Sequence, residues 1–182
     1  MEALIFGVLL AMALFWAVGA HNRLVRLRAE VVRQWGSVDA VWLRLLVRMQ
    51  GGIAARQSLV TPANDGEGEL QALQSACDEL MEALLQARLQ PLAVESQKQV
   101  VALHQKVVLE IRTLLQKENE AVKPDLEIAL NRMRQTLPAA LIPYHVAVTA
   151  YNDALGMQPA AWLARRLGFQ LATKLDLSVG AS

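Results

Sequence analysis

The sequence predicts an all-α protein, in which an N-terminal transmembrane helix continues into the first long helix of an antiparallel, up-down-up-down helical bundle. Residues 3–22 contain no charged side chain. Beyond them, apolar residues recur at spacings of three and four, as on one face of an α-helix. No stretch shows the strict alternation that is typical of a half-buried β-strand. These three observations together favour helices packed on helices.

Residues 1–22 form the predicted membrane anchor. A helix of about 20 residues spans a hydrocarbon core of about 30 Å. Trp16 lies toward the end of this run, where an indole ring favours the headgroup region. A signal peptide is the alternative, because Val18 and Ala20 resemble a small-residue cleavage site. The residues before the run include no Lys or Arg, which favours an uncleaved span.

The charges that flank the anchor predict its orientation. Glu2 is the only charged side chain before the span, whereas Arg23, Arg26 and Arg28 follow it directly. Basic residues are enriched on the cytoplasmic side of membrane spans. We therefore expect the N-terminus outside and the rest of the chain in the cytoplasm.

The first bundle helix is predicted at 23–57, as an unbroken continuation of the anchor. Its apolar seam has spacings of 4, 3, 4, 3 and 4, at Val31, Trp35, Val38, Trp42, Leu45 and Met49. Neither Gly nor Pro interrupts the chain at Asn22, where the anchor ends. A stripe of this length needs partners, either within the chain or in neighbouring protomers.

Three further helices complete the predicted bundle, which spans residues 23–158. Pro, Asn, Asp and Gly at 58–69 indicate a loop, and helices follow at about 68–90, 93–118 and 124–157. Pro138 and Pro143 predict a kink at 138–143 in the last helix. Cys77, the only cysteine, is predicted to be a buried apolar residue. Four alternating helices return the chain to the membrane.

The tail, residues 159–182, is therefore predicted to be membrane-proximal. It carries Trp162, Leu163, Leu167 and Phe169 together with Arg165 and Arg166. An amphipathic segment of this composition can rest on anionic headgroups. Packing against the base of the bundle is the other interpretation, and the sequence leaves both open.

Two blocks of the chain resemble the LemA family. The segment "HNRLVRLRAEVVRQWGSVDAVWLR" matches the family pattern at Asn22, Leu24, Val25, Trp35, Val38 and Asp39. The segment "AVTAYNDALGMQPAAWLARRLGF" resembles a second signature, at Tyr151, Asn152, Pro159, Gly168 and Phe169. His21 replaces the usual aromatic residue before Asn22, and Gly51 and Gly52 stand where the family has a proline-containing segment. The middle of the chain matches only in helical character.

The resemblance implies a bundle anchored in the bacterial inner membrane, from a family whose function is poorly defined. A magnetosome-associated branch of the family points to membrane organisation. The Tyr-Asn pair also has a physical interpretation: Tyr151 and Asn152 would face Asn22 and set the register of the first and last bundle helices. Tyr144 and His145 would extend this ladder. Ligand binding is the alternative.

The residue types that could act in catalysis or bind a metal ion are not grouped in a recognisable motif. His21, His104 and His145 lie on different predicted segments, without a second ligand at metal-binding spacing. Asp78, Glu79 and Glu82 are most simply a solvated helix face. No phosphate-binding loop or serine-hydrolase elbow is present. We therefore predict no enzyme activity, no catalytic residue, no cofactor and no metal ion.

The distribution of charge along the chain and the apolar seam of the first bundle helix together predict the class of function. Net charge is +5 for residues 21–56 and −6 for residues 57–130, and +1 overall, which does not favour nucleic-acid binding. The prediction is a self-associating scaffold that organises or shapes the membrane, with the bilayer and copies of itself as partners. The alternative is a tethered adaptor that positions another membrane protein, such as a protease, through the acidic middle of the chain.

Overall fold

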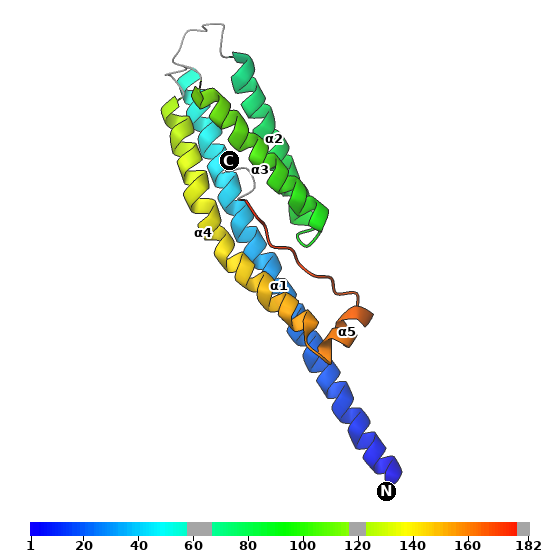
Figure 1. Ribbon diagram of the computed structural model, residues 1–182. Coiled ribbons are helices and arrows are strands. Elements are labelled where there is room, and N and C mark those ends of the chain that lie inside the picture. Colours follow the sequence, from blue (N-terminus) through cyan, green and yellow to red (C-terminus); the bar gives the residue numbers. More distant parts are fainter. Residues whose placement is uncertain (58–66, 117–122, 178–182) are drawn as a thin grey trace.

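The computed structural model describes residues 1–57, 67–116 and 123–177. Over these ranges the chain is helical and contains no strand (Figure 1). The helices are α1 (Glu2–Gln57), α2 (Glu67–Leu89), α3 (Val94–Gln116), α4 (Lys123–Gly156) and α5 (Ala160–Arg166). The predicted all-α class and the long apolar N-terminal helix are confirmed. Most of the predicted loop at 58–69 lies outside the described residues.

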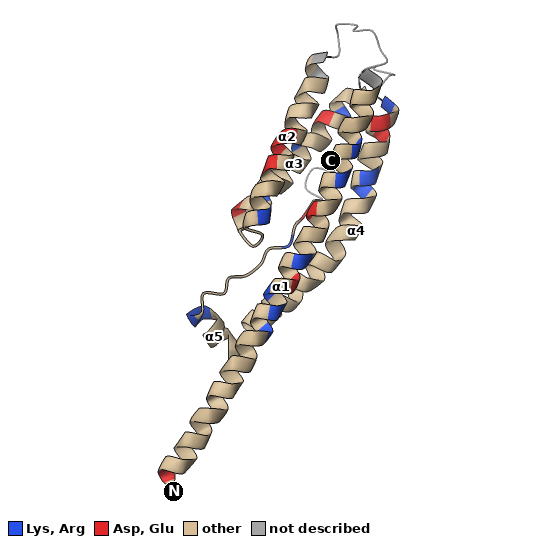
Figure 2. Ribbon diagram, turned by 180° about the vertical axis from the view of Figure 1, so that it is seen from behind, with Lys and Arg blue, Asp and Glu red and all other residues tan. Residues whose placement is uncertain are grey.

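Helix α1 runs without a break for 56 residues. It contains a stretch that is long and apolar enough to cross a membrane, and none of that stretch is buried in the protein. The N-terminal part of α1 projects beyond the other helices (Figure 1). In Figure 2 this part is uncharged except for an acidic residue at the N-terminal tip. Within the ranges that the structure describes, no other segment covers the apolar side chains of this part.

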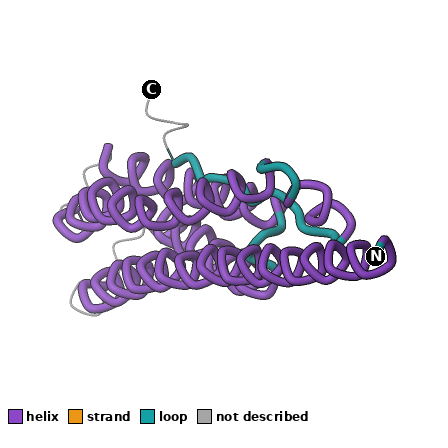
Figure 3. Tube along the Cα trace, turned by 90° about the horizontal axis from the view of Figure 1, so that it is seen from below, coloured by secondary structure: helices purple, strands orange, loops and turns teal. Residues whose placement is uncertain are grey.

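The other helices accompany only the second part of α1. Helix α4 lies along α1, and α2 packs chiefly against α3. Successive long helices run in opposite directions, and the α2–α3 hairpin lies beside the part of the α1–α4 pair farthest from the N-terminus (Figures 1 and 3). One apolar core takes side chains from all four long helices.

The seam on α1 is buried within the chain. Trp35 and Trp42 are 1% and 0% exposed, with ring centroids 6.3 Å apart. Trp35 also lies edge-on to Tyr144 of α4, at 5.9 Å. The seam therefore packs in the core of its own chain.

The ends of the helices lie close to the predicted ones, with one difference in the tail. Helix α4 remains helical through Pro138 and Pro143, and Figure 1 shows it bent near its middle, as the predicted kink at 138–143 leads us to expect. The tail contains a separate short helix, α5, followed by residues 167–177 without regular structure, which we call the C-terminal strap.

Candidate functional site

The candidate site is the junction where α5 and the C-terminal strap meet α1 and α4. Helix α5 contacts both of these helices. Phe169, at the start of the strap, lies edge-on to His21 of α1, with ring centroids 5.9 Å apart. Because the uncharged run of α1 ends at Asn22, the junction lies at the level where α1 would leave a membrane.

The turn after α5 depends on a glycine. Gly168 has φ of 72°, in the left-handed region that side chains disfavour. The Gly168 N–H donates to the Arg165 carbonyl and the Phe169 N–H to the Ala164 carbonyl, at 3.3 and 3.0 Å. This pair of bonds is a Schellman motif, which ends the helix and reverses the chain. The strap thus leaves α5 in a fixed direction.

The strap is held by a Tyr-Asn pair of α4. The Asn152 side-chain amide donates to the Ala172 carbonyl at 2.8 Å and accepts from the Ala172 N–H at 3.0 Å. The Tyr151 hydroxyl donates to the Gln170 carbonyl at 2.9 Å. These bonds satisfy backbone groups that have no regular secondary structure to pair with.

A second pair, seven residues earlier on α4, continues the same contact. The Tyr144 hydroxyl donates to the Thr173 carbonyl at 2.8 Å, and His145 Nε2 lies 2.9 Å from the Leu175 carbonyl, so this nitrogen carries the proton. All four of these side chains therefore bind the backbone of the strap. The expectation that Tyr151 and Asn152 pair with Asn22 is wrong, because Asn152 is engaged by Ala172 and Asn22 is exposed.

Burial keeps both tyrosines protonated. Desolvation raises the pKa of Tyr144 to about 12, against a smaller lowering by the hydrogen bond from Gln97. Desolvation also raises the pKa of Tyr151, and the nearby Arg28 charge opposes this. Both hydroxyls therefore remain donors to the strap over the physiological pH range.

The outer side of the junction exposes large apolar side chains beside arginines. Trp162 is 65% exposed, and Met157, Leu167 and Leu171 are also exposed. The Arg166 guanidinium lies 5.9 Å from the centre of the Trp162 ring. The predicted membrane-proximal arginines are all exposed, namely Arg23, Arg26, Arg28, Arg165 and Arg166. The strap thus packs on protein, while α5 leaves apolar surface uncovered.

A second group of polar side chains joins the α2–α3 hairpin to α1 and α4. Asp39 is 1% exposed, and its Oδ2 accepts from Arg88 Nε of α2 at 2.8 Å. The sequence singled out Asp39 but gave no indication of Arg88 as its partner. In the described part of the chain, Asp39 Oδ1 and Trp35 Nε1 are buried without a hydrogen-bond partner.

His104 is buried, which was not predicted from the sequence. The Trp42 indole N–H donates to His104 Nδ1 at 3.3 Å, and the two rings meet edge-on. Burial lowers the pKa of His104 to about 4, so the ring is neutral at pH 7. The signal was present in the sequence, since His104 occupies the apolar seam of its helix, one turn from Val100 and Val107.

Gln97 links the hairpin to α4. Its amide donates to the Tyr144 hydroxyl at 2.9 Å and to the Pro91 carbonyl at 2.7 Å. Tyr144 accepts this bond while donating to the strap, so its hydroxyl connects the hairpin and the C-terminal segment.

An open groove of about 620 Å³ lies between α3 and α4 and is bordered by the end of the strap. Its lining is mostly apolar, with Val108, Met133, Leu141 and Leu175 among the residues that form it. In the described ranges, no three His, Cys, Asp or Glu side chains are grouped so that they could hold a metal ion. Cys77 is buried, as predicted, and desolvation raises its thiol pKa to about 12.

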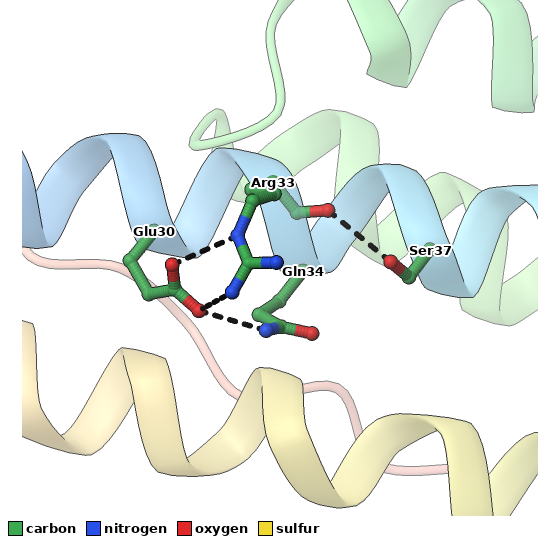
Figure 4. Close-up of polar contacts among 4 residues, drawn as sticks. All are labelled: Glu30, Arg33, Gln34 and Ser37. Atoms are coloured by element: carbon green, nitrogen blue, oxygen red, sulfur yellow. Dashed lines mark hydrogen bonds and ion pairs between the residues drawn. The ribbon is translucent and has the colours of Figure 1, made fainter.

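The polar face of α1 is occupied by local contacts. Arg33 donates to both carboxylate oxygens of Glu30, at 2.9 and 2.6 Å, and Gln34 donates to Glu30 at 2.7 Å (Figure 4). These bonds, first from Arg33 and then from Gln34, lower the pKa of Glu30. Contacts at this spacing stabilise the helix itself.

Comparison of the chain with protein-family models, with curated proteins and with solved structures found no match. What these residues can do is therefore inferred from their geometry and chemistry.

Proposed function

We propose that this protein is a non-enzymatic, single-pass membrane scaffold that self-associates and organises the bacterial inner membrane. The observation that carries the proposal is helix α1, whose exposed, uncharged first part continues without a break into a buried core helix. Exposed apolar surface of this extent is stable in lipid and unstable in water.

The continuous helix supports a rigid connection between bilayer and domain. An unbroken α-helix transmits its orientation from span to core. The arginines that follow the span favour a cytoplasmic location for the domain. In this arrangement α1 to α4 form an up-down-up-down bundle standing on the membrane, as the resemblance to the LemA family also implies.

Self-association is supported by a second face of α1. Val25 and Val32 are 46% and 40% exposed, and Ala29 and Gly36 on the same face are exposed too. The position that a side chain at Gly36 would occupy is open. Residues at these spacings share one helix face, which Val18 continues into the span. Anchoring aligns copies in parallel, so this face can pack against its equivalent in a second copy.

The adaptor alternative has less support. Its acidic surface would include Asp78, Glu79 and Glu82, which already have partners in the chain. Glu79 pairs with Lys106 at 2.7 Å, Asp78 accepts from Gln50, and Glu82 accepts from Gln86. A partner would have to compete with these contacts.

Cysteine cross-linking in membranes tests the proposal. In a Cys77→Ala background, Val32→Cys places a thiol on the proposed face, and Ser37→Cys places one on the opposite, polar face of the same helix as a matched control. We expect Val32→Cys to form disulfide-linked dimers and Ser37→Cys to remain monomeric. Equal cross-linking of both variants, or of neither, would contradict self-association through this face.

The same control variant tests the orientation. A membrane-impermeant thiol reagent applied to intact cells should label Ser37→Cys only after the inner membrane is permeabilised. Labelling from outside would reverse the proposed topology.

A further inference from the structure

We propose that α5 and the start of the C-terminal strap form a second, interfacial contact with the bilayer, selective for lipids with anionic headgroups. This inference rests on the proposed membrane anchoring of α1 and adds a lipid-binding surface to it.

Position is the first argument. Helix α5 packs on α1 and α4, and Phe169 contacts His21, one residue before the end of the uncharged run. Trp16 lies five residues before His21 on α1, about 8 Å along the helix axis. Interfacial helices bury their apolar faces by about 5–10 Å at the boundary between headgroups and acyl chains. Helix α5 therefore lies at the depth where such a helix binds.

Uncovered apolar surface is the second argument. Met157, Trp162, Leu167 and Leu171 are all at least 49% exposed, although they belong to one short region of the chain. The buried side of the same region, including Ala161 and Ala164, is already packed on the protein. The bilayer is the occupant that fits, since the helix that enters it, α1, is in direct contact with α5.

Charge is the third argument. Arg165 and Arg166 follow Trp162 within one turn of α5, and Arg23 and Arg26 leave α1 at the same level. Figure 2 shows that the basic residues of α5 lie beyond the end of the uncharged, projecting part of α1. A tryptophan with neighbouring arginines suits the interface, where the ring meets the acyl boundary and the guanidinium groups meet phosphates.

The strap supplies the rigidity that this contact requires. Its bonds to Tyr144, His145, Tyr151 and Asn152 of α4, together with the Gly168 turn, fix the chain that leaves α5, which itself contacts α1 and α4. A tail without these bonds would not keep Trp162 at one depth.

Tryptophan quenching in reconstituted vesicles tests the inference with the full-length protein. The vesicles contain phosphatidylcholine and phosphatidylglycerol, with bromine atoms near the carbonyl end of the acyl chains of one lipid at a time. Subtracting the signal of Trp162→Phe isolates Trp162, and Trp16→Phe isolates Trp16 in the same way. Both side chains are exposed, so neither substitution disturbs the core.

We expect both tryptophans to be quenched. Quenching of Trp162 should be stronger with brominated phosphatidylglycerol than with brominated phosphatidylcholine, by up to about fivefold for each of Arg165 and Arg166 that lies at the anionic surface. Arg165→Gln with Arg166→Gln should lower this ratio toward one, and Arg23 and Arg26 account for what remains of it. Arg44→Gln with Arg48→Gln, on the exposed part of α1 away from the junction, is the matched control and should leave the ratio unchanged.

The contradicting outcomes are distinct. Quenching of Trp16 without quenching of Trp162 would overturn the interfacial contact and leave the anchor intact. Equal quenching of Trp162 by both lipids would overturn the selectivity. Absence of quenching for both residues would overturn the membrane anchoring on which the inference rests.

Discussion

Two segments are attached to the α1–α4 pair, and they are attached by different kinds of bond. The α2–α3 hairpin is joined through side chains that bind side chains, such as the buried Trp42 with His104, and the buried Asp39 with the half-exposed Arg88. The C-terminal strap is joined through side chains of α4 that bind its backbone at a partly exposed surface. The hairpin should therefore separate only when the whole domain unfolds, whereas the strap can open locally.

Tyr144 is the point where the two regions meet. It is fully buried, and its hydroxyl bonds to Gln97 of the hairpin and to Thr173 of the strap. Substitutions in the hairpin should therefore affect global unfolding and substitutions in the strap its local opening, whereas a substitution at Tyr144 should affect both.

The largest effect is expected from Arg88→Met. Removing the guanidinium leaves the buried Asp39 carboxylate without its charged partner, which costs about 3 kcal/mol for buried pairs. The Arg88 side chain is half exposed, so a somewhat smaller loss of global unfolding free energy is expected in urea titrations. Adding Asp39→Asn should restore part of it, and Arg132→Met, an exposed control, should have little effect. A loss of stability confined to the α2–α3 hairpin would contradict the expectation that the hairpin separates only when the whole domain unfolds.

Acid should weaken the core through His104. The folded-state pKa of about 4 lies below the ordinary 6.5, so the unfolded chain binds the proton more readily. Stability is then full above pH 6.5 and falls as the pH decreases toward 4, by up to about 1.4 kcal/mol per pH unit. His104→Gln, whose amide oxygen can still accept from Trp42, should flatten this slope in urea titrations across that window. An unchanged slope would show that other groups produce it.

Tyr144→Phe should affect both regions at once. The substitution keeps the ring and removes the hydroxyl, at a cost of about 1–2 kcal/mol in global stability. Hydrogen exchange measured by mass spectrometry should show faster exchange both in the strap and in the first turns of α3. Acceleration in the strap alone would mean that the bond to Gln97 contributes nothing.

The smallest global effect is expected from Asn152→Asp. The carboxylate keeps the bond from the Ala172 N–H but loses the donor to the Ala172 carbonyl. Exchange in the strap should rise by a factor of roughly five to ten, equivalent to about 1 kcal/mol, with global stability nearly unchanged. Asn22→Asp is the matched control: an equal effect there would restore the pairing with Asn22 that the sequence predicts.

The sequence was sufficient for the helices and insufficient for their polar contacts. The spacing of Trp35, Val38 and Trp42 predicts a buried helix face, because apolar periodicity depends only on local geometry. The Asp39–Arg88 contact joins residues 49 positions apart, and no local pattern specifies such a pair. Packing of the tail on the bundle was one of the two interpretations that the sequence left open, but its attachment to Tyr151 and Asn152 was not predicted, because these side chains bind the backbone of the strap and not its side chains.

The central claim is that this protein self-associates as a membrane-anchored scaffold. The most direct measurement is the particle size of the full-length protein by electron microscopy after detergent solubilisation, beside a version without residues 1–22. The account predicts large or repeating assemblies of the full-length chain that are lost or much reduced on truncation. Uniform monomers of the full-length protein would contradict it.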